Sequence, residues 1–183
     1  MTLAWALVLL WTGVGAAGRW PELFAALGCP WPWASAVAAA IVLLQGTGAV
    51  HGTSVGAVLL PTGAALALFA RLPPAQRERT LEAALLGALA LVLGRALAGG
   101  SGAAVVATLA GIAIAVLAPS QGSATAAALG GLSGVPALFD ASFRLSSPSA
   151  ADGLLAGATS AVVATTILGR LGARWRTEGR FRL

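Results

Sequence analysis

The sequence is short of charge. Only 9% of its 183 residues are Asp, Glu, Lys or Arg, and 58% are hydrophobic. A soluble globular domain carries roughly 25% charged residues, so this chain has too little polar surface to cover a water-soluble protein of its size. Its apolar residues come in blocks of about 15 to 22 with almost no charge inside them, which is the length that crosses a bilayer. The sequence therefore predicts an integral membrane protein.

Cysteine and histidine occur once each, and lysine is absent. The single cysteine, Cys29, excludes a disulfide framework and a cysteine-rich metal site. His51 has only Cys29 and two aspartates as potential co-ligands, so we expect no metal and no cofactor. It lies in a glycine-rich polar break between two apolar blocks, where capping or interfacial contact is the main interpretation and contact with a solute or proton the alternative.

Glycine and alanine are abundant, and they suit close helix packing in lipid. Small residues let helix backbones approach one another where the surrounding solvent is hydrocarbon. Gly-x-x-x-Gly pairs, among them those that begin at Gly52, Gly130 and Gly153, have the same meaning. The predicted fold class is therefore all-α, a polytopic transmembrane helical bundle.

Prolines and glycines divide the chain into about seven apolar blocks, with six to eight spans as the range. The first block is predicted to be a retained helix and not a cleaved signal peptide, because no Lys or Arg precedes it. The connector 19–33 holds Trp20, Trp31 and Trp33 among three prolines. We expect it to lie along the membrane interface, with a short helix that starts at Pro21. The predicted spans are 2–18, 33–45, 53–70, 81–98, 102–118, 123–143 and 150–169.

The arginines segregate strongly between the two sides. With seven spans, nine lie on one side and two, Arg95 and Arg144, on the other. By the positive-inside rule, the side that holds the nine arginines is cytoplasmic, so the N-terminus is outside. The expected location of the protein is the cell membrane of a prokaryote. A single transmembrane domain, 1–169, then precedes a basic cytoplasmic tail, 170–183, whose arginines contact the lipid interface. The nine cytoplasmic arginines are Arg19, Arg71, Arg77, Arg79, Arg170, Arg174, Arg176, Arg180 and Arg182.

Asp140 and Asp152 are the main candidates for chemistry, because carboxylates beside membrane spans are costly and often functional. Both are predicted at the outer ends of the last two helices. They could form the acid–base pair of an intramembrane aspartyl peptidase, or couple a proton or cation. Structural roles compete: Ser149-Ala-Ala-Asp152 has capping-box spacing, and Asp140 stands four residues before Arg144, an ion-pair spacing. The Tyr-Asp and Gly-x-Gly-Asp signatures of such peptidases are absent, which disfavours proteolysis.

Three further residues complete a candidate solute or ion site with Asp140, Asp152 and His51. Arg95, on the same outer side, is expected to snorkel to the interface, or alternatively to pair with one of the aspartates. Pro61 and Pro136 each lie inside a predicted span, in segments that loosely echo each other and run in opposite directions. Paired proline-broken helices in an inverted repeat point to a transporter site at the membrane midplane.

Four short motifs follow one another: SVGAVLLP at 54–61, AVLAP at 115–119, ALGGLSG at 128–134 and ADGLLAG at 151–157. In this order they resemble a family of small prokaryotic multi-pass membrane proteins of unknown function. In size and composition the chain is also similar to the YphA-type proteins of sporulating bacteria. The resemblance covers about residues 50–170 and implies an Asp-Gly pair before the last helix, matched by Asp152. The family's earlier aspartate, in a Gly-Ala-Asp context, is not matched by Asp140. The resemblance implies no activity.

These observations favour a small transporter or a membrane component that binds a solute or ion. A noncatalytic scaffold or assembly subunit, whose basic tail contacts anionic lipid or a cytoplasmic partner, is the second hypothesis. An aspartyl peptidase is the third, and enzymatic activity is not expected. The expected partners are the lipid bilayer and a membrane or cytoplasmic protein, with nucleic acid excluded because the arginines lie at the ends of the apolar blocks. The oligomeric state is not defined by the sequence.

Overall fold

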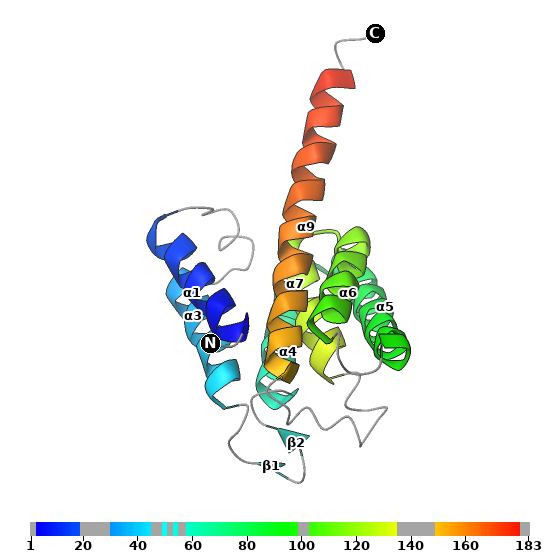
Figure 1. The fold of residues 1–183 in the computed structure, drawn as a ribbon. Helices are drawn as coiled ribbons and strands as arrows, with labels where there is room; N and C mark the ends of the chain where they lie inside the picture. Colours follow the sequence, from blue (N-terminus) through cyan, green and yellow to red (C-terminus); the bar gives the residue numbers. More distant parts are fainter. Residues whose placement is uncertain are drawn as a thin grey trace.

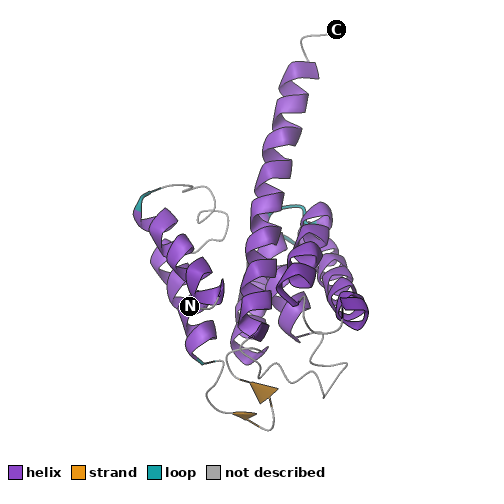
Figure 2. Ribbon diagram, in the orientation of Figure 1, coloured by secondary structure: helices purple, strands orange, loops and turns teal. Residues whose placement is uncertain are grey.

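The computed structural model describes residues 3–18, 30–44, 49–50, 53–54, 58–98, 103–134 and 149–179, and these are almost entirely helical (Figures 1 and 2). Apart from short connections, the described residues also hold one hairpin, in which β1 (Ala49–Val50) pairs antiparallel with β2 (Thr53–Ser54). The α-helices are α1 (Leu3–Ala16), α3 (Trp31–Leu43), α4 (Leu60–Arg71), α5 (Pro74–Ala98), α6 (Ala103–Leu117), α7 (Gln121–Leu129), which continues as the π-helical turn η2 (Gly130–Gly134), and α9 (Ser149–Gly179).

Every predicted span overlaps one of these helices, so the all-helical class is confirmed, but several boundaries were wrong. The span predicted over 53–70 is α-helical only from Leu60, because Thr53–Ser54 pairs in the hairpin and a π-helical turn occupies 58–59. Helix α5 begins at Pro74 and not at Leu81, and α9 continues to Gly179, past the predicted end at Gly169. Trp31 and Trp33, predicted in an interfacial connector, instead lie in the first turn of α3. Pro30 is the N-cap of that helix, and proline suits the start of a helix because its missing N–H would have no partner there.

Successive helices run in opposite directions. Gly94, near the end of α5, lies against Val106, near the start of α6. The start of α4 meets the end of the α7–η2 segment through Thr62 and Ser133, whose hydroxyl oxygens are 3.3 Å apart. Helices α1, α4, α6 and α9 therefore point one way, and α3, α5 and α7 the other. We call the two ends of the bundle the Arg71 end and the Asp152 end, after the residues that lie there. The contacts that fix the remaining pairs are Gly15 with Trp31, Gln76 with Ser120, Gln121 with Thr166, Thr108 with Ser160, and Ala4 with Asp152.

The segment formed by α7 and η2 is the centre of the bundle and packs against α4, α5 and α9. Nearly all of its residues are small and buried. Within this centre, the hydroxyls of Thr80 and Ser123 lie 2.7 Å apart and both side chains are fully buried. Hydroxyl pairs of this kind hold neighbouring helices together where no water reaches them.

Glycines set the closest helix approaches. A Cβ added at Gly157 in α9 would lie 2.8 Å from the carbonyl oxygen of Ala107 in α6, and one at Gly131 would lie 3.0 Å from the Cα of Ala84 in α5. The pair that begins at Gly153 thus contributes to packing as predicted. In the pair that begins at Gly130, the close contact comes instead from the next residue, Gly131. The pair that begins at Gly52 lies outside the described residues.

Many large apolar side chains of α5 and α6 point outward. On α5, Ala83 is fully buried while Leu85 and Leu89 are 57% and 54% exposed; on α6, Ala110 is 1% and Val116 is 69% exposed. Among the described residues, one segment, Asp152–Gly172, is long and apolar enough to cross a membrane, with 21 residues and a mean hydropathy of 1.5. Leu3–Ala16, Trp31–Leu43 and Ala104–Leu117 are apolar but shorter. That seven helices cross the bilayer therefore stays a prediction.

Candidate functional site

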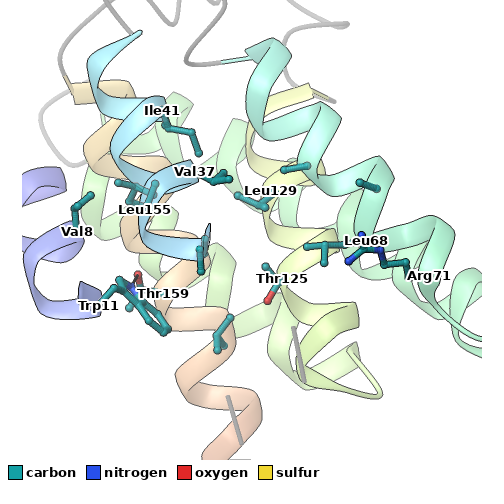
Figure 3. Close-up of a pocket in the computed structure, with 16 residues that line it drawn as sticks. Val8, Trp11, Val37, Ile41, Leu68, Arg71, Thr125, Leu129, Leu155 and Thr159 are labelled. Carbon is teal, nitrogen blue, oxygen red and sulfur yellow. Dashed lines mark hydrogen bonds between the residues drawn. The ribbon is translucent and has the colours of Figure 1, made fainter. Parts of the chain in front are cut away.

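A cavity of ≈ 300 Å³ separates the α1–α3 pair from the rest of the bundle (Figure 3). Helices α1 and α3 form one wall, α4 the opposite wall, and α7 and α9 the floor between them. We call this cavity the groove. Its lining residues are Val8, Trp11, Ala34, Val37, Ala38, Ile41, Ala64, Ala67, Leu68, Arg71, Thr125, Leu129, Leu155, Ala158, Thr159 and Val162.

The groove changes from polar to apolar along its length. Arg71, Trp11 and Thr125 lie toward the Arg71 end, because they come late in α4 and α1 and early in α7. Ile41 and Leu155, from the end of α3 and the start of α9, lie toward the other end. Ile41 is 1% and Leu155 7% exposed, so this deeper part is closed and wholly apolar. A molecule with one polar and one apolar end would match this gradient.

Two arginines lie together where α4 ends. Arg77 donates hydrogen bonds to the carbonyl oxygens of Leu72 and Ala70, both at 3.0 Å, and its guanidinium stands 6.0 Å from the ring centre of Phe69. These bonds satisfy carbonyls that the helix end would leave without a partner. Arg71, in the last turn of the same helix, is exposed and lines the mouth of the groove.

Asp152 acts as a cap. Its carboxylate accepts a hydrogen bond of 2.6 Å from the backbone N–H of Ala4, in the first turn of α1, and it also lies in the first turn of its own helix, α9. A carboxylate is favoured at a helix N-terminus because the unpaired N–H groups there carry partial positive charge. One side chain thus serves two parallel helices. The sequence indicated the second role but not the first, whose partner is 148 residues away.

The other predicted site residues are placed only in part. Pro61, predicted inside a proline-broken span, is buried in the first turn of α4, directly after a π-helical turn at 58–59, so it lies where the α-helix begins. Arg95 lies in the last turn of α5, at the Asp152 end, on the side predicted for it; its side chain lies outside the described part of the chain. His51, Asp140, Pro136 and Arg144 also lie outside it, as do Trp20, Arg180 and Arg182.

Sequence reasoning missed the polar groups that join α1 and α7 to α9. The indole nitrogen of Trp11 donates a 3.0 Å hydrogen bond to the hydroxyl of Thr159, at the edge of the groove (Figure 3). Gln121 donates a 2.6 Å hydrogen bond to the hydroxyl of Thr166. The only signal in the sequence is a threonine at 159 and another at 166, which alanine-rich helices commonly contain for packing.

Within the described residues, no group of three or more His, Cys, Asp or Glu side chains could hold a metal ion. Comparisons with protein-family models, with curated proteins and with solved structures found no match. What the described residues offer is therefore a groove with a polar mouth and an apolar interior, and not a constellation of reactive groups.

Proposed function

We propose that the protein is an integral membrane protein whose helical bundle binds a small apolar or amphipathic solute in the groove. The observation that carries the proposal is the inverted distribution of side-chain size. The interior is rich in alanine, glycine, serine and threonine, with some larger residues such as Leu91 and Ile114 among them, whereas most leucine, isoleucine and valine side chains of α5 and α6 are exposed. Water-soluble proteins rarely expose apolar patches of this extent, but lipid solvates them at no cost.

The helix directions support the membrane topology. Seven described helices that alternate in direction carry the chain from one side to the other an odd number of times. Among the described residues, Arg71, Arg77, Arg79 and Arg170 lie toward the Arg71 end, and Arg95 toward the Asp152 end. This is the segregation that the positive-inside rule needs, with the Arg71 end in the cytoplasm of a prokaryotic cell.

A binding component fits the groove better than an enzyme does. The groove lies at the lower limit of the usual volume of ligand pockets, and it is mostly apolar with a few polar groups, as such pockets are. Asp152 is engaged in capping α1, so in this arrangement it stabilises a helix and activates no water. This observation favours solute binding over the aspartyl peptidase.

A noncatalytic scaffold is the second candidate, and α9 favours it. This helix has 31 residues and extends well beyond the other helices toward the C-terminus (Figure 1). Its extension carries the chain outside the bundle, where the basic tail would meet anionic lipid or a cytoplasmic partner.

The membrane part of the proposal is tested by extraction and by reporter fusions. The chain should stay in the membrane fraction after alkaline carbonate treatment, and release into the supernatant would overturn the proposal. Reporters fused after Arg79, Arg144 and Leu183 should give cytoplasmic, periplasmic and cytoplasmic signals. A periplasmic signal at Leu183 would reverse the orientation.

The binding part is tested by filling the groove. Radiolabelled dodecanol, an uncharged single-chain solute, should bind the purified full-length protein, and Ala38→Leu or Ala67→Leu should abolish binding because both alanines line the groove. Ala96→Leu, on the exposed face of α5, adds the same bulk elsewhere and should have no effect. Equal binding by all three variants would refute binding in the groove.

A further inference from the structure

Resting on the proposed binding function, we infer that the occupant of the groove is a bilayer lipid with an anionic phosphate head group. One acyl chain lies in the groove, and the phosphate meets Arg71 at its mouth. The chain and the head group are argued separately, because different residues recognise them.

The groove has the dimensions of an acyl-chain segment. Its α9 side runs from Leu155 to Val162, seven residue steps or about 10 Å of helix. Its volume of ≈ 300 Å³ is that of roughly ten water molecules in the liquid, and a methylene group is close to a water molecule in size. A segment of roughly ten methylenes therefore fits both the length and the volume. The buried apolar end, at Ile41 and Leu155, has no polar group to offer to a more polar solute.

The mouth of the groove is electropositive. Arg71 lines it, and the carbonyl oxygens that would make the end of α4 negative are covered by Arg77. Of the helices that line the groove, α3 and α7 begin at this end and α1 ends there, so two partial positive N-termini face one partial negative C-terminus. An arginine guanidinium also matches the geometry of a phosphate, to which it can donate two parallel hydrogen bonds. A phosphate is favoured here over a neutral or cationic head group.

The exposed residues of the rim show how a lipid would enter. Ala67 and Arg71 on α4 line the groove and are exposed, whereas the residues of the floor are buried or half-buried. The groove therefore opens to the side of the bundle along the last turns of α4. With the bundle in a bilayer, this opening faces lipid, and the head group would stay at the depth of the cytoplasmic arginines.

Native mass spectrometry on the full-length protein tests the inference. The protein in detergent is mixed with dioleoyl phosphatidylglycerol and with dioleoylglycerol, which lacks the phosphate, in equal amounts. One phosphatidylglycerol should bind per chain, with a preference of about tenfold or more over dioleoylglycerol, the contribution of one charge-assisted hydrogen bond. Arg71→Gln should remove the preference, and Arg71→Lys should keep part of it because the charge remains.

Arg79→Gln is the matched control. It removes the same charge from the same end of the bundle, at an exposed arginine of α5 that does not line the groove. Loss of preference in Arg79→Gln equal to that in Arg71→Gln would overturn the inference in favour of a diffuse basic surface. Competition by glycerol phosphate without an acyl chain, at the same concentration as the lipid, would also overturn it.

The outcomes separate this inference from the proposed function. If both lipids bind equally and Ala38→Leu abolishes binding of both, the groove binds apolar chains without charge selection, and only the inference fails. If neither lipid nor dodecanol binds, the proposed function fails as well. Circular dichroism and monodisperse elution of each variant ensure that a lost signal reflects the groove and not unfolding.

Discussion

Replacing Gly111 by alanine should disrupt the largest helix–helix contact of the described structure, between α6 and α9. A Cβ at Gly111 would meet the backbone oxygen of Gly157 and the hydroxyl oxygen of Ser160 at distances that no real Cβ atom adopts. The obstacle includes backbone, so no side-chain rotation can relieve it. The two helices must move apart instead.

The magnitude follows from two terms. Inserting extra atoms into a close-packed contact typically costs about 1–3 kcal/mol. Moving α9 away also stretches the hydrogen bond of 3.0 Å from the Ser160 hydroxyl to the Thr108 carbonyl oxygen, which contributes about 0.5–1.5 kcal/mol. The helix preference of alanine over glycine offsets up to about 1 kcal/mol of these terms, so we expect the free energy of unfolding to fall by about 0.5–4.5 kcal/mol in Gly111→Ala.

Unfolding in mixed micelles by increasing dodecyl sulfate, followed by circular dichroism, measures this change. Gly169→Ala is the control, because a Cβ at Gly169 of α9 meets nothing within 4 Å. In that variant the helix preference of alanine over glycine should leave stability equal or raised by up to about 1 kcal/mol. If Gly111→Ala unfolds at the same detergent fraction as Gly169→Ala, close packing of α6 on α9 is refuted.

Two further predictions concern buried hydrogen bonds. Asp152→Ala should destabilise the protein by about 0.5–2 kcal/mol, the usual cost of losing an N-terminal cap, and should speed hydrogen exchange in the first turns of α1. Asp152→Asn keeps a hydrogen-bond acceptor and should therefore lose less stability. Equal exchange rates in the two variants and the unchanged protein would contradict the contact with Ala4. Thr80→Val should lower the free energy of unfolding by about 1–3 kcal/mol, because it leaves the buried Ser123 hydroxyl without its partner. The double variant with Ser123→Ala should lose less stability than the two single variants added together. Strict additivity in the same unfolding assay would show that the pair does not interact.

The helices were predictable because local signals determine them. Prolines and glycines interrupt the apolar blocks, and each block between them forms a helix whatever its neighbours do. The errors arose where a local signal has two meanings. Pro61 can break a helix or begin one, and only the hairpin at Thr53–Ser54, which depends on pairing with Ala49–Val50, decides between them.

The groove could not be predicted, because no single segment contains it. Its walls come from five helices spread over residues 8 to 162, and its lining alanines look like every other alanine in the chain. Arg71 was interpreted only as a marker of topology, since its place at the mouth depends on how α4 packs against α7. Asp152 was predicted as a candidate because a carboxylate is costly beside a membrane. Its contact with the backbone N–H of Ala4 in α1 depends on tertiary structure alone.

The lengths of the helices have a consequence for the membrane itself. Helices α1, α3, α4 and α6 have 14, 13, 12 and 15 residues, so their helical rise is about 18–23 Å, against a hydrocarbon thickness of about 30 Å. With 25 and 31 residues, α5 and α9 rise about 38 and 46 Å. If the bundle sits in the bilayer as proposed, its short helices are shorter than the hydrocarbon thickness and two longer helices extend beyond it. The bilayer would then be compressed around it, at fractions of a kcal/mol per Å of mismatch, and the protein would concentrate where the membrane is already thin.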